Sequence, residues 1–209
     1  MKSKIDWKEI RKNSFIAFLV AILAGPINLL SPYLLPGNAS TGDEGFTMGL
    51  YTISVSAWLL IGLVNVYLDR SRKSILGLLY FILTTVVIIL GVHVSSQLSN
   101  SELTGNLLVL GLFLSSIIIG LTRAQYISEY GFASYLLVPS ITVGFQIAGG
   151  IITFWLYMVS LFLLGGVPFI GMFLPSSVSL AVFVGGYWFV ISLAEQTIIK
   201  PVVKANESN

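Results

Sequence analysis

Apolar residues along the chain gather in six long runs, which short polar connectors separate. A run of about 20 apolar residues has the length that an α-helix needs to cross a hydrocarbon core roughly 30 Å thick. The hydrophobic pattern therefore predicts an all-α integral membrane protein with six transmembrane helices. The predicted spans cover roughly residues 14–35, 47–68, 75–96, 105–122, 135–163 and 178–199.

The positive charges decide the expected orientation of these spans. With the N-terminus inside, all eleven Lys and Arg residues fall on the inner side, whereas Asp43, Glu44 and Glu102 fall outside. Lys and Arg in short loops resist translocation across the membrane. We therefore expect both termini in the cytoplasm and the protein in the plasma or inner membrane. The expected organisation is a basic cytoplasmic N-terminus (1–13), a six-helix transmembrane domain (14–199) and a cytoplasmic tail (200–209).

The fifth apolar run is longer than one span requires. As a single helix, residues 134–164 would extend about 46 Å, and they include Pro139 and the pair Gly149-Gly150. We favour an interfacial segment up to Pro139 followed by one span. The alternative is two half-helices around Gln146 and the glycine pair. The uncharged segment VPFIGMFLP (167–175) is expected to lie at the outer interface.

Composition narrows the chemistry that these spans can perform. The chain is 56% hydrophobic and 10% charged, and it has no cysteine, which excludes disulfides, thiol catalysis and iron–sulfur clusters. Its single histidine, His93, argues against a self-contained haem, copper or di-iron site. No P-loop, paired-aspartate or serine-protease motif is present. We therefore expect no catalytic residues, no metal and no cofactor, and predict that the protein is not an enzyme.

The even-numbered spans share a short internal repeat. Each has an Ile-small-Leu triplet, followed two residues later by a polar residue near the inner face. Odd spans lead outward and even spans lead back, so the chain is predicted to form three consecutive helical hairpins. Chance is the alternative, because Ile, Gly and Leu are common in any membrane helix. The copies, offset by 58 and then 72 residues, are Ala57–Leu63 with Asn65, Ser115–Leu121 with Arg123 and Tyr187–Leu193 with Glu195.

Several short features accompany the three hairpins. They are Pro36-Gly37 at the end of the first span, Gly49 opening the second, the basic connector 69–73, and Gly165-Gly166-Val167-Pro168 before the segment 179–193. With the hairpin layout, they resemble the HdeD family of small bacterial membrane proteins, which is associated with acid resistance. The resemblance covers nearly the whole chain; the outer segment 37–46 and the long fifth region depart from it. It implies a role in envelope or acid stress and no catalytic residues.

The first span ends in an unusual stretch, AGPINLLSPYLLP (24–36). Pro26 removes the hydrogen bond to the carbonyl of residue 22, so we expect it to kink the helix. Asn28 is placed to satisfy a freed backbone group or a neighbouring helix. The alternative is a functional break in which Asn28 lines a ligand or ion path.

Three other polar residues are candidates for function. His93, near the outer end of the third span, is expected either to bond headgroups and water or to sense the outside pH. Glu195 lies within the last span, where charge is costly, and is read as a paired or snorkelling carboxylate or as a proton relay. Arg123 marks the inner interface, and its pairing with Glu195 is left open by the sequence.

Three functions follow from these observations. The first is a non-enzymatic membrane protein of the HdeD kind, related to envelope or acid stress. The second is an accessory subunit of a larger membrane complex of respiratory or oxidase type. The third is a small channel or transporter, which requires Asn28, Asn65, Gln146 or Glu195 to face a shared interior. Expected partners are the lipid bilayer and either further copies of the chain or a larger membrane complex, but not nucleic acid.

Overall fold

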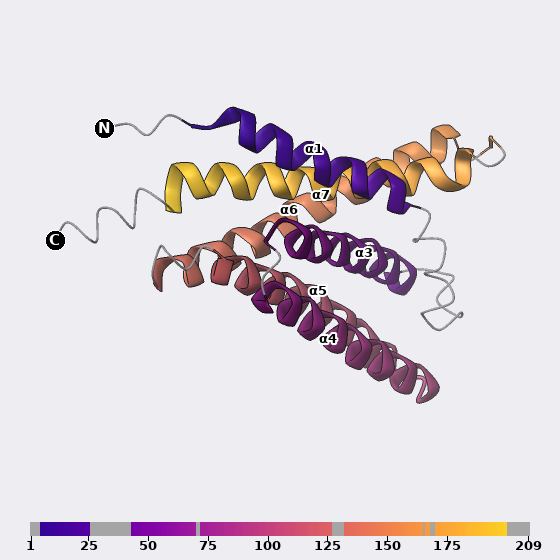
Figure 1. The fold of residues 1–209 in the computed structure, drawn as a ribbon. Coiled ribbons are helices and arrows are strands. Elements are labelled where there is room, and N and C mark those ends of the chain that lie inside the picture. The colour runs from indigo at the N-terminus through magenta and orange to yellow at the C-terminus, as the bar shows by residue number, and fades with distance from the viewer. Residues whose placement is uncertain are drawn as a thin grey trace.

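The computed structural model describes residues 5–25, 43–69, 72–126, 132–164, 166–167 and 170–199, and the elements in this part of the chain are all helical. Figure 1 shows these helices in chain order from α1 to α7. They are α1 (Trp7–Ala24), α3 (Asp43–Asp69), α4 (Arg72–Gln97), α5 (Ser101–Tyr126), α6 (Phe132–Leu164), α7 (Ile170–Ala194) and the π-helical turn η3 (Glu195–Ile199).

Within the described residues, five helices are long and apolar enough to cross a membrane: α3, α4, α5, α6 and α7 with η3. This confirms the helical class, and five of the six predicted spans coincide with helices of suitable length and hydropathy. Helix α1 contains the charged residues Lys8, Glu9, Arg11 and Lys12, and its described part ends at Gly25. The expected kink at Pro26 and the candidate Asn28 lie outside the described residues.

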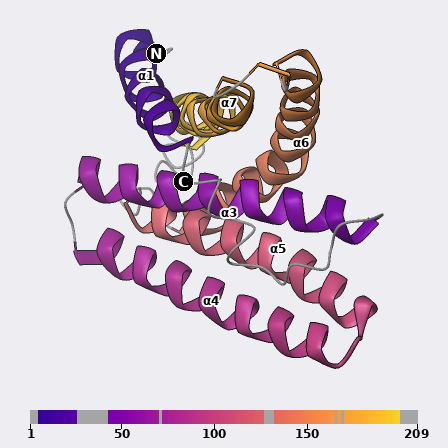
Figure 2. The same ribbon diagram turned by 90° about the vertical axis from the view of Figure 1, so that its right-hand side faces the viewer.

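The helices form two groups that cross each other. Helices α3, α4 and α5 pack together on one side, and α1, α6 and α7 on the other (Figure 2). The contacts of α5 with α6 and of α3 with α7 join the two groups. Successive helices alternate in direction, so the start of α1, the ends of α3 and α5, and the end of α7 meet at one end of the bundle, on the left in Figure 1. We call this the basic end.

Helix α1 packs mainly on α7 rather than on its neighbour in sequence, α3. The two helices approach closely because Gly25 has no side chain: a Cβ there would overlap the backbone of Ser177. The Ser176 hydroxyl also donates to the carbonyl of Gly25 at 3.3 Å. The α4–α5 and α6–α7 pairs are each in extensive contact, but the first helix joins the last across the whole chain.

Helix α6 decides between one helix and two in the fifth region. It runs unbroken from Phe132 to Leu164, through Pro139 and both central glycines, so two half-helices are not formed, and the residues before Pro139 belong to the same helix as the span that follows. Hydroxyl groups support the backbone beside the proline: Ser140 donates to the carbonyl of Leu136 at 2.7 Å. Helix α7 also begins earlier than expected, at residue 170, so much of the segment 167–175 is helical.

Aromatic side chains fill the interface between the two helix groups. Trp58 of α3 packs edge-on against Phe183 and Tyr187 of α7, with ring centroids 5.5 and 5.2 Å apart. Phe145 of α6 contacts the same two α7 rings. In contrast, α4 and α6 expose long apolar faces. A buried aromatic core and an apolar exterior are the arrangement expected of a bundle whose solvent is lipid.

Candidate functional site

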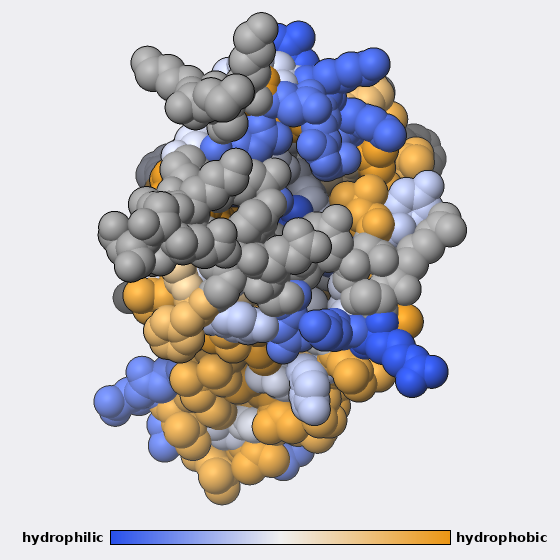
Figure 3. Space-filling view, turned by 60° about the vertical axis from the view of Figure 1, so that its left-hand side comes forward, coloured by the Kyte–Doolittle hydropathy of each residue, from blue (hydrophilic) through white to orange (hydrophobic). Residues whose placement is uncertain are grey.

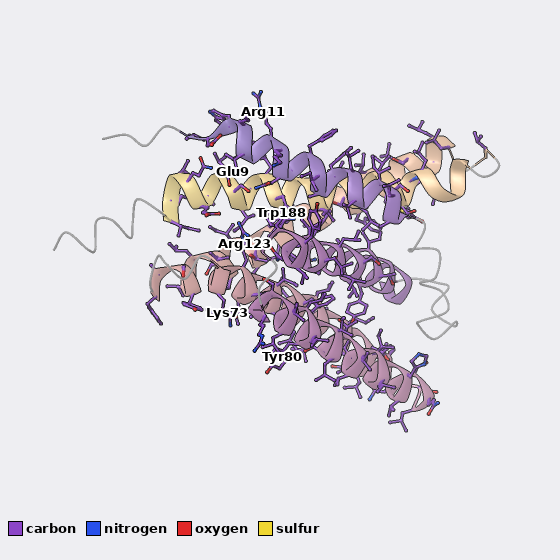
Figure 4. The ribbon with its side chains drawn as sticks, in the orientation of Figure 1. Glu9, Arg11, Lys73, Tyr80, Arg123 and Trp188 are labelled. Carbon is purple, nitrogen blue, oxygen red and sulfur yellow. The ribbon has the colours of Figure 1, made fainter. Side chains whose placement is uncertain are left out.

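A polar cavity of about 210 Å³ opens at the basic end, where α1, α3, α5 and α7 meet. Figure 3, which brings this end forward, shows hydrophilic residues gathered there and a largely apolar flank below them. Figure 4 places Glu9, Arg123 and Trp188 in this region. The cavity is lined by Glu9 and Asn13 of α1, Leu68 of α3, Arg123 of α5, Trp188 and Ser192 of α7, and Glu195 and Gln196 of η3.

An ion pair between α5 and η3 forms one wall of the cavity. Nη2 of Arg123 lies 3.2 Å from Oε2 of Glu195, and the two side chains are only 7% and 17% exposed. The guanidinium also lies over the Trp188 ring, 4.9 Å from its centroid. The pairing that the sequence left open is therefore formed, and Glu195 has a partner on another helix rather than a purely local one.

The backbone changes its winding at the acidic member of this pair. Helix α7 passes at Glu195 into the five-residue π-helical turn η3. π-Helical turns are rare and occur frequently at functional sites. Gln196 within this turn accepts a hydrogen bond from the backbone N–H of Asp6 at 2.7 Å. Asp6 also caps α1 by accepting from the N–H groups of Lys8 and Glu9. The first and last helices are thus tied together at the cavity.

Two polar groups near the cavity have no hydrogen-bond partner among the described residues. Asn65 of α3 is 3% exposed, and neither its amide nitrogen nor its carbonyl oxygen is bonded. It lies one helical turn before the cavity-lining Leu68, on the same face of α3. Trp188 is fully buried, and its indole N–H is also unbonded. Unsatisfied polar groups in an apolar interior cost several kcal/mol. They therefore mark a place where a polar ligand gains binding energy.

The internal repeat agrees with the burial of α3, α5 and α7. The repeated isoleucines Ile61, Ile119 and Ile191 are all fully buried. The polar residues that follow them are Asn65, buried beside Leu68, and the two members of the ion pair. The pattern thus marks equivalent inward-facing positions on three helices.

Gln146 has a different role from the one that a channel requires. Its side chain lies between α6 and α3, where its carbonyl oxygen accepts from the indole N–H of Trp58 at 2.5 Å. Its amide nitrogen donates to the hydroxyl of Ser54 at 3.1 Å. Both ends of the amide are used, and the residue is 5% exposed. Gln146 connects two helices and does not line the cavity.

His93 is placed far from this site. It lies near the end of α4, whereas Arg123 lies near the end of the antiparallel α5, so the two occupy opposite ends of the bundle (Figure 1). The structure therefore brings together Arg123 and Glu195, places Asn65 one helical turn before the cavity-lining Leu68, and leaves Gln146 and His93 elsewhere. Asn28 is outside the described residues. In the described part of the chain, no three His, Asp or Glu side chains gather as metal ligands.

Sequence reasoning missed six residues of the cavity: Glu9, Asn13, Leu68, Trp188, Ser192 and Gln196. The repeat carried a signal for two of them, because Trp188 and Ser192 belong to its third copy. Glu9 and Asn13 carried no such signal. Two polar residues four positions apart in a charged N-terminal segment are typical of any solvated helix face.

The fold and the site define a class: an all-helical protein with membrane-length helices and a polar, charge-lined cavity at one end. No protein-family model, curated protein or solved structure matches the chain. The resemblance to the HdeD family stays a prediction.

Proposed function

We propose that this chain is a non-enzymatic multi-pass membrane protein that binds a small polar solute in the cavity at the basic end, as the binding step of a small transporter. The observation that carries the proposal is a buried Arg123–Glu195 ion pair on the wall of a polar cavity inside a helical bundle. Charged residues within membrane helices are rare and commonly mark substrate or ion pathways.

The size of the cavity limits the solute. A volume of about 210 Å³ corresponds to roughly seven water molecules. A solute with about that number of non-hydrogen atoms fills the space. Ser192, Gln196 and Asn13 supply neutral hydrogen-bonding groups in the lining.

The charges of the lining favour a cationic solute. The cavity has two carboxylates, Glu9 and Glu195, and one guanidinium, Arg123. Arg123 and Glu195 neutralise each other in the ion pair. The carboxylate of Glu9 is the third charge of the lining, and it lies outside this pair. Glu9 is an exposed residue at the mouth of the cavity, where its carboxylate can form a charge-assisted hydrogen bond with an entering ammonium group.

The orientation follows from the positive-inside rule. Helices α1 and α4 both begin at the end of the bundle that holds the cavity. Their N-terminal turns carry the cations Lys8, Arg11 and Lys12 on α1 and Arg72 and Lys73 on α4. Since basic segments stay in the cytoplasm, we place the mouth of the cavity on the cytoplasmic side of the cell membrane. The solute would then be taken up from, or released to, the cytoplasm.

Thermal unfolding of the purified protein in mild detergent tests the proposal, with ethylamine, acetate and glycine added separately at matched concentrations. We expect ethylamine to raise the unfolding midpoint and acetate to leave it unchanged, since a ligand that binds only the folded state stabilises it. Glycine shows whether a carboxylate on the same solute is tolerated. Uptake of labelled ethylamine into proteoliposomes then separates transport from binding.

Glu9→Gln is the diagnostic variant and Glu102→Gln the matched control, because Glu102 is an exposed acid in the first turn of α5, away from the cavity. The ethylamine response is expected to disappear in Glu9→Gln and persist in Glu102→Gln. A response to acetate alone would reverse the charge assignment. No response to any of the three solutes would remove the proposal and favour the accessory-subunit function, which native mass spectrometry of complexes from native membranes tests directly.

A further inference from the structure

A second depression, with different chemistry, lies between α1 and α7 and has a volume of about 670 Å³. It is an open groove with apolar walls. Its lining includes Arg11, Lys12, Phe15 and Phe18 of α1 and Gly185 and Phe189 of α7. Of these residues, none lines the polar cavity.

Gly185 of α7 lies against α1 at the floor of the groove. A Cβ there would lie 3.2 Å from the Cβ of Phe18, closer than most packed atoms, so a larger residue would push α1 away. The rings of Phe15, Phe18 and Phe189 remain 61%, 36% and 40% exposed. The groove is therefore a shallow, open apolar surface that the protein leaves uncovered along its own flank.

Two cations lie at the basic end of this groove. Arg11 and Lys12 are exposed and precede Phe15 by about one helical turn. Figure 4 shows the Arg11 side chain pointing away from the bundle. The two cations thus lie about one helical turn, or 5 Å, from the apolar walls. In the orientation that we propose, they are on the side of the cytoplasmic headgroup layer.

We propose that this groove is a binding site for an anionic phospholipid of the cytoplasmic leaflet. Arg11 and Lys12 bind the phosphate of the headgroup, and the exposed phenylalanine rings and Gly185 seat an acyl chain. Basic residues beside an apolar inter-helix surface on the cytoplasmic side have the chemistry that recognises acidic lipid headgroups. An anionic phospholipid carries both the negative charge and the apolar chain that the two parts of the groove fit, and in a membrane it surrounds this flank.

Native mass spectrometry of the protein released from mixed micelles tests the site, with phosphatidylglycerol and phosphatidylcholine of identical acyl chains in equal amounts. We expect phosphatidylglycerol to be retained about thirty-fold in preference, from two nearby cations. Arg11→Gln/Lys12→Gln is expected to abolish the preference. Arg72→Gln/Lys73→Gln is the matched control: it removes two exposed cations at the same end of the bundle, on α4, and is expected to keep it.

A third arm uses glycerol 1-phosphate, which has the phosphate without an acyl chain and is expected not to compete with phosphatidylglycerol. Full competition by this probe would show a simple phosphate site and overturn the lipid assignment. Equal loss of preference in both double variants would show diffuse surface charge instead of a site. Absence of any preference in the unmodified protein would also overturn the proposal. Because Glu9 is not part of the groove, Glu9→Gln is expected to keep lipid selectivity, so this site and the solute cavity can fail independently.

Discussion

Nη2 of Arg123 lies 3.2 Å from Oε2 of Glu195, although 72 residues of chain separate them. The guanidinium is held from a second side by the face of Trp188, 4.9 Å from its centroid. In an apolar bundle an unpaired charge is expensive, whereas a well-compensated pair is tolerated. The pair therefore fixes where α5 and the end of α7 meet, and it holds the polar cavity between them.

Removal of one partner is expected to destabilise the protein more than removal of both. Glu195→Gln leaves the buried guanidinium without its carboxylate and should lower stability by about 3 kcal/mol, the low end for a buried pair because the cavity admits water. Arg123→Gln/Glu195→Gln should recover at least half of this loss. Thermal unfolding in detergent measures both changes. Equal effects of Glu195→Gln and the exposed control Glu102→Gln would contradict a stabilising pair.

The sequence predicted the helices better than their partners. Runs of apolar residues reveal where membrane-length helices lie, because length and composition are local properties. Which helices pack together depends on surfaces distant in the chain. Nothing in the apolar run of α1 indicates that its partner is α7, since the reason is the contact of Gly25 with Ser177, 152 residues later.

The candidate site was predicted in part for the same reason. The repeat singled out Asn65, Arg123 and Glu195, because a polar residue at the same place in three apolar patterns is visible in the sequence. The pattern could not show that two of them bond to each other, because a side chain's partner is set by helix rotation and crossing. In the sequence, Gln146 is also a polar residue within an apolar span. In the structure, however, its amide group bonds to Trp58 and Ser54.

Gly120 is predicted to be required for the contact of α5 with α6. A Cβ at Gly120 would lie 2.8 Å from the Cα of Pro139, a backbone atom that cannot rotate away. Gly120→Ala should therefore destabilise the protein by about 1–3 kcal/mol through overpacking. Gly144→Ala on α6 is the matched control, because a Cβ there meets nothing within 4 Å. Alanine's higher helix propensity should make that variant neutral or up to about 1 kcal/mol more stable. Similar unfolding midpoints for the two variants would refute this packing.

Gln146→Leu is expected to weaken the connection between α6 and α3 without affecting the cavity. The substitution leaves the Trp58 indole N–H and the Ser54 hydroxyl without the partner they have in the bundle. The expected cost is about 1–3 kcal/mol of stability, with a change in tryptophan emission. The response to ethylamine should remain, and Gln97→Leu, at an exposed position on α4, should change neither property. Loss of the ethylamine response in Gln146→Leu would instead return Gln146 to the solute path.

Asn65→Leu is expected to separate stability from solute binding. In the free protein Asn65 is buried with both amide groups unbonded, so an apolar side chain of similar size removes a desolvation cost of about 1–3 kcal/mol. The variant should therefore unfold at a higher temperature without solute, and it should respond more weakly to ethylamine. Retained polar groups that lower stability are typical of functional sites. Leu68→Ala, one turn away, is the contrasting variant, since it enlarges the cavity and lowers stability by loss of packing. A lower unfolding temperature for Asn65→Leu would mean that the amide contributes to the fold, and an unchanged ethylamine response would place the solute away from α3.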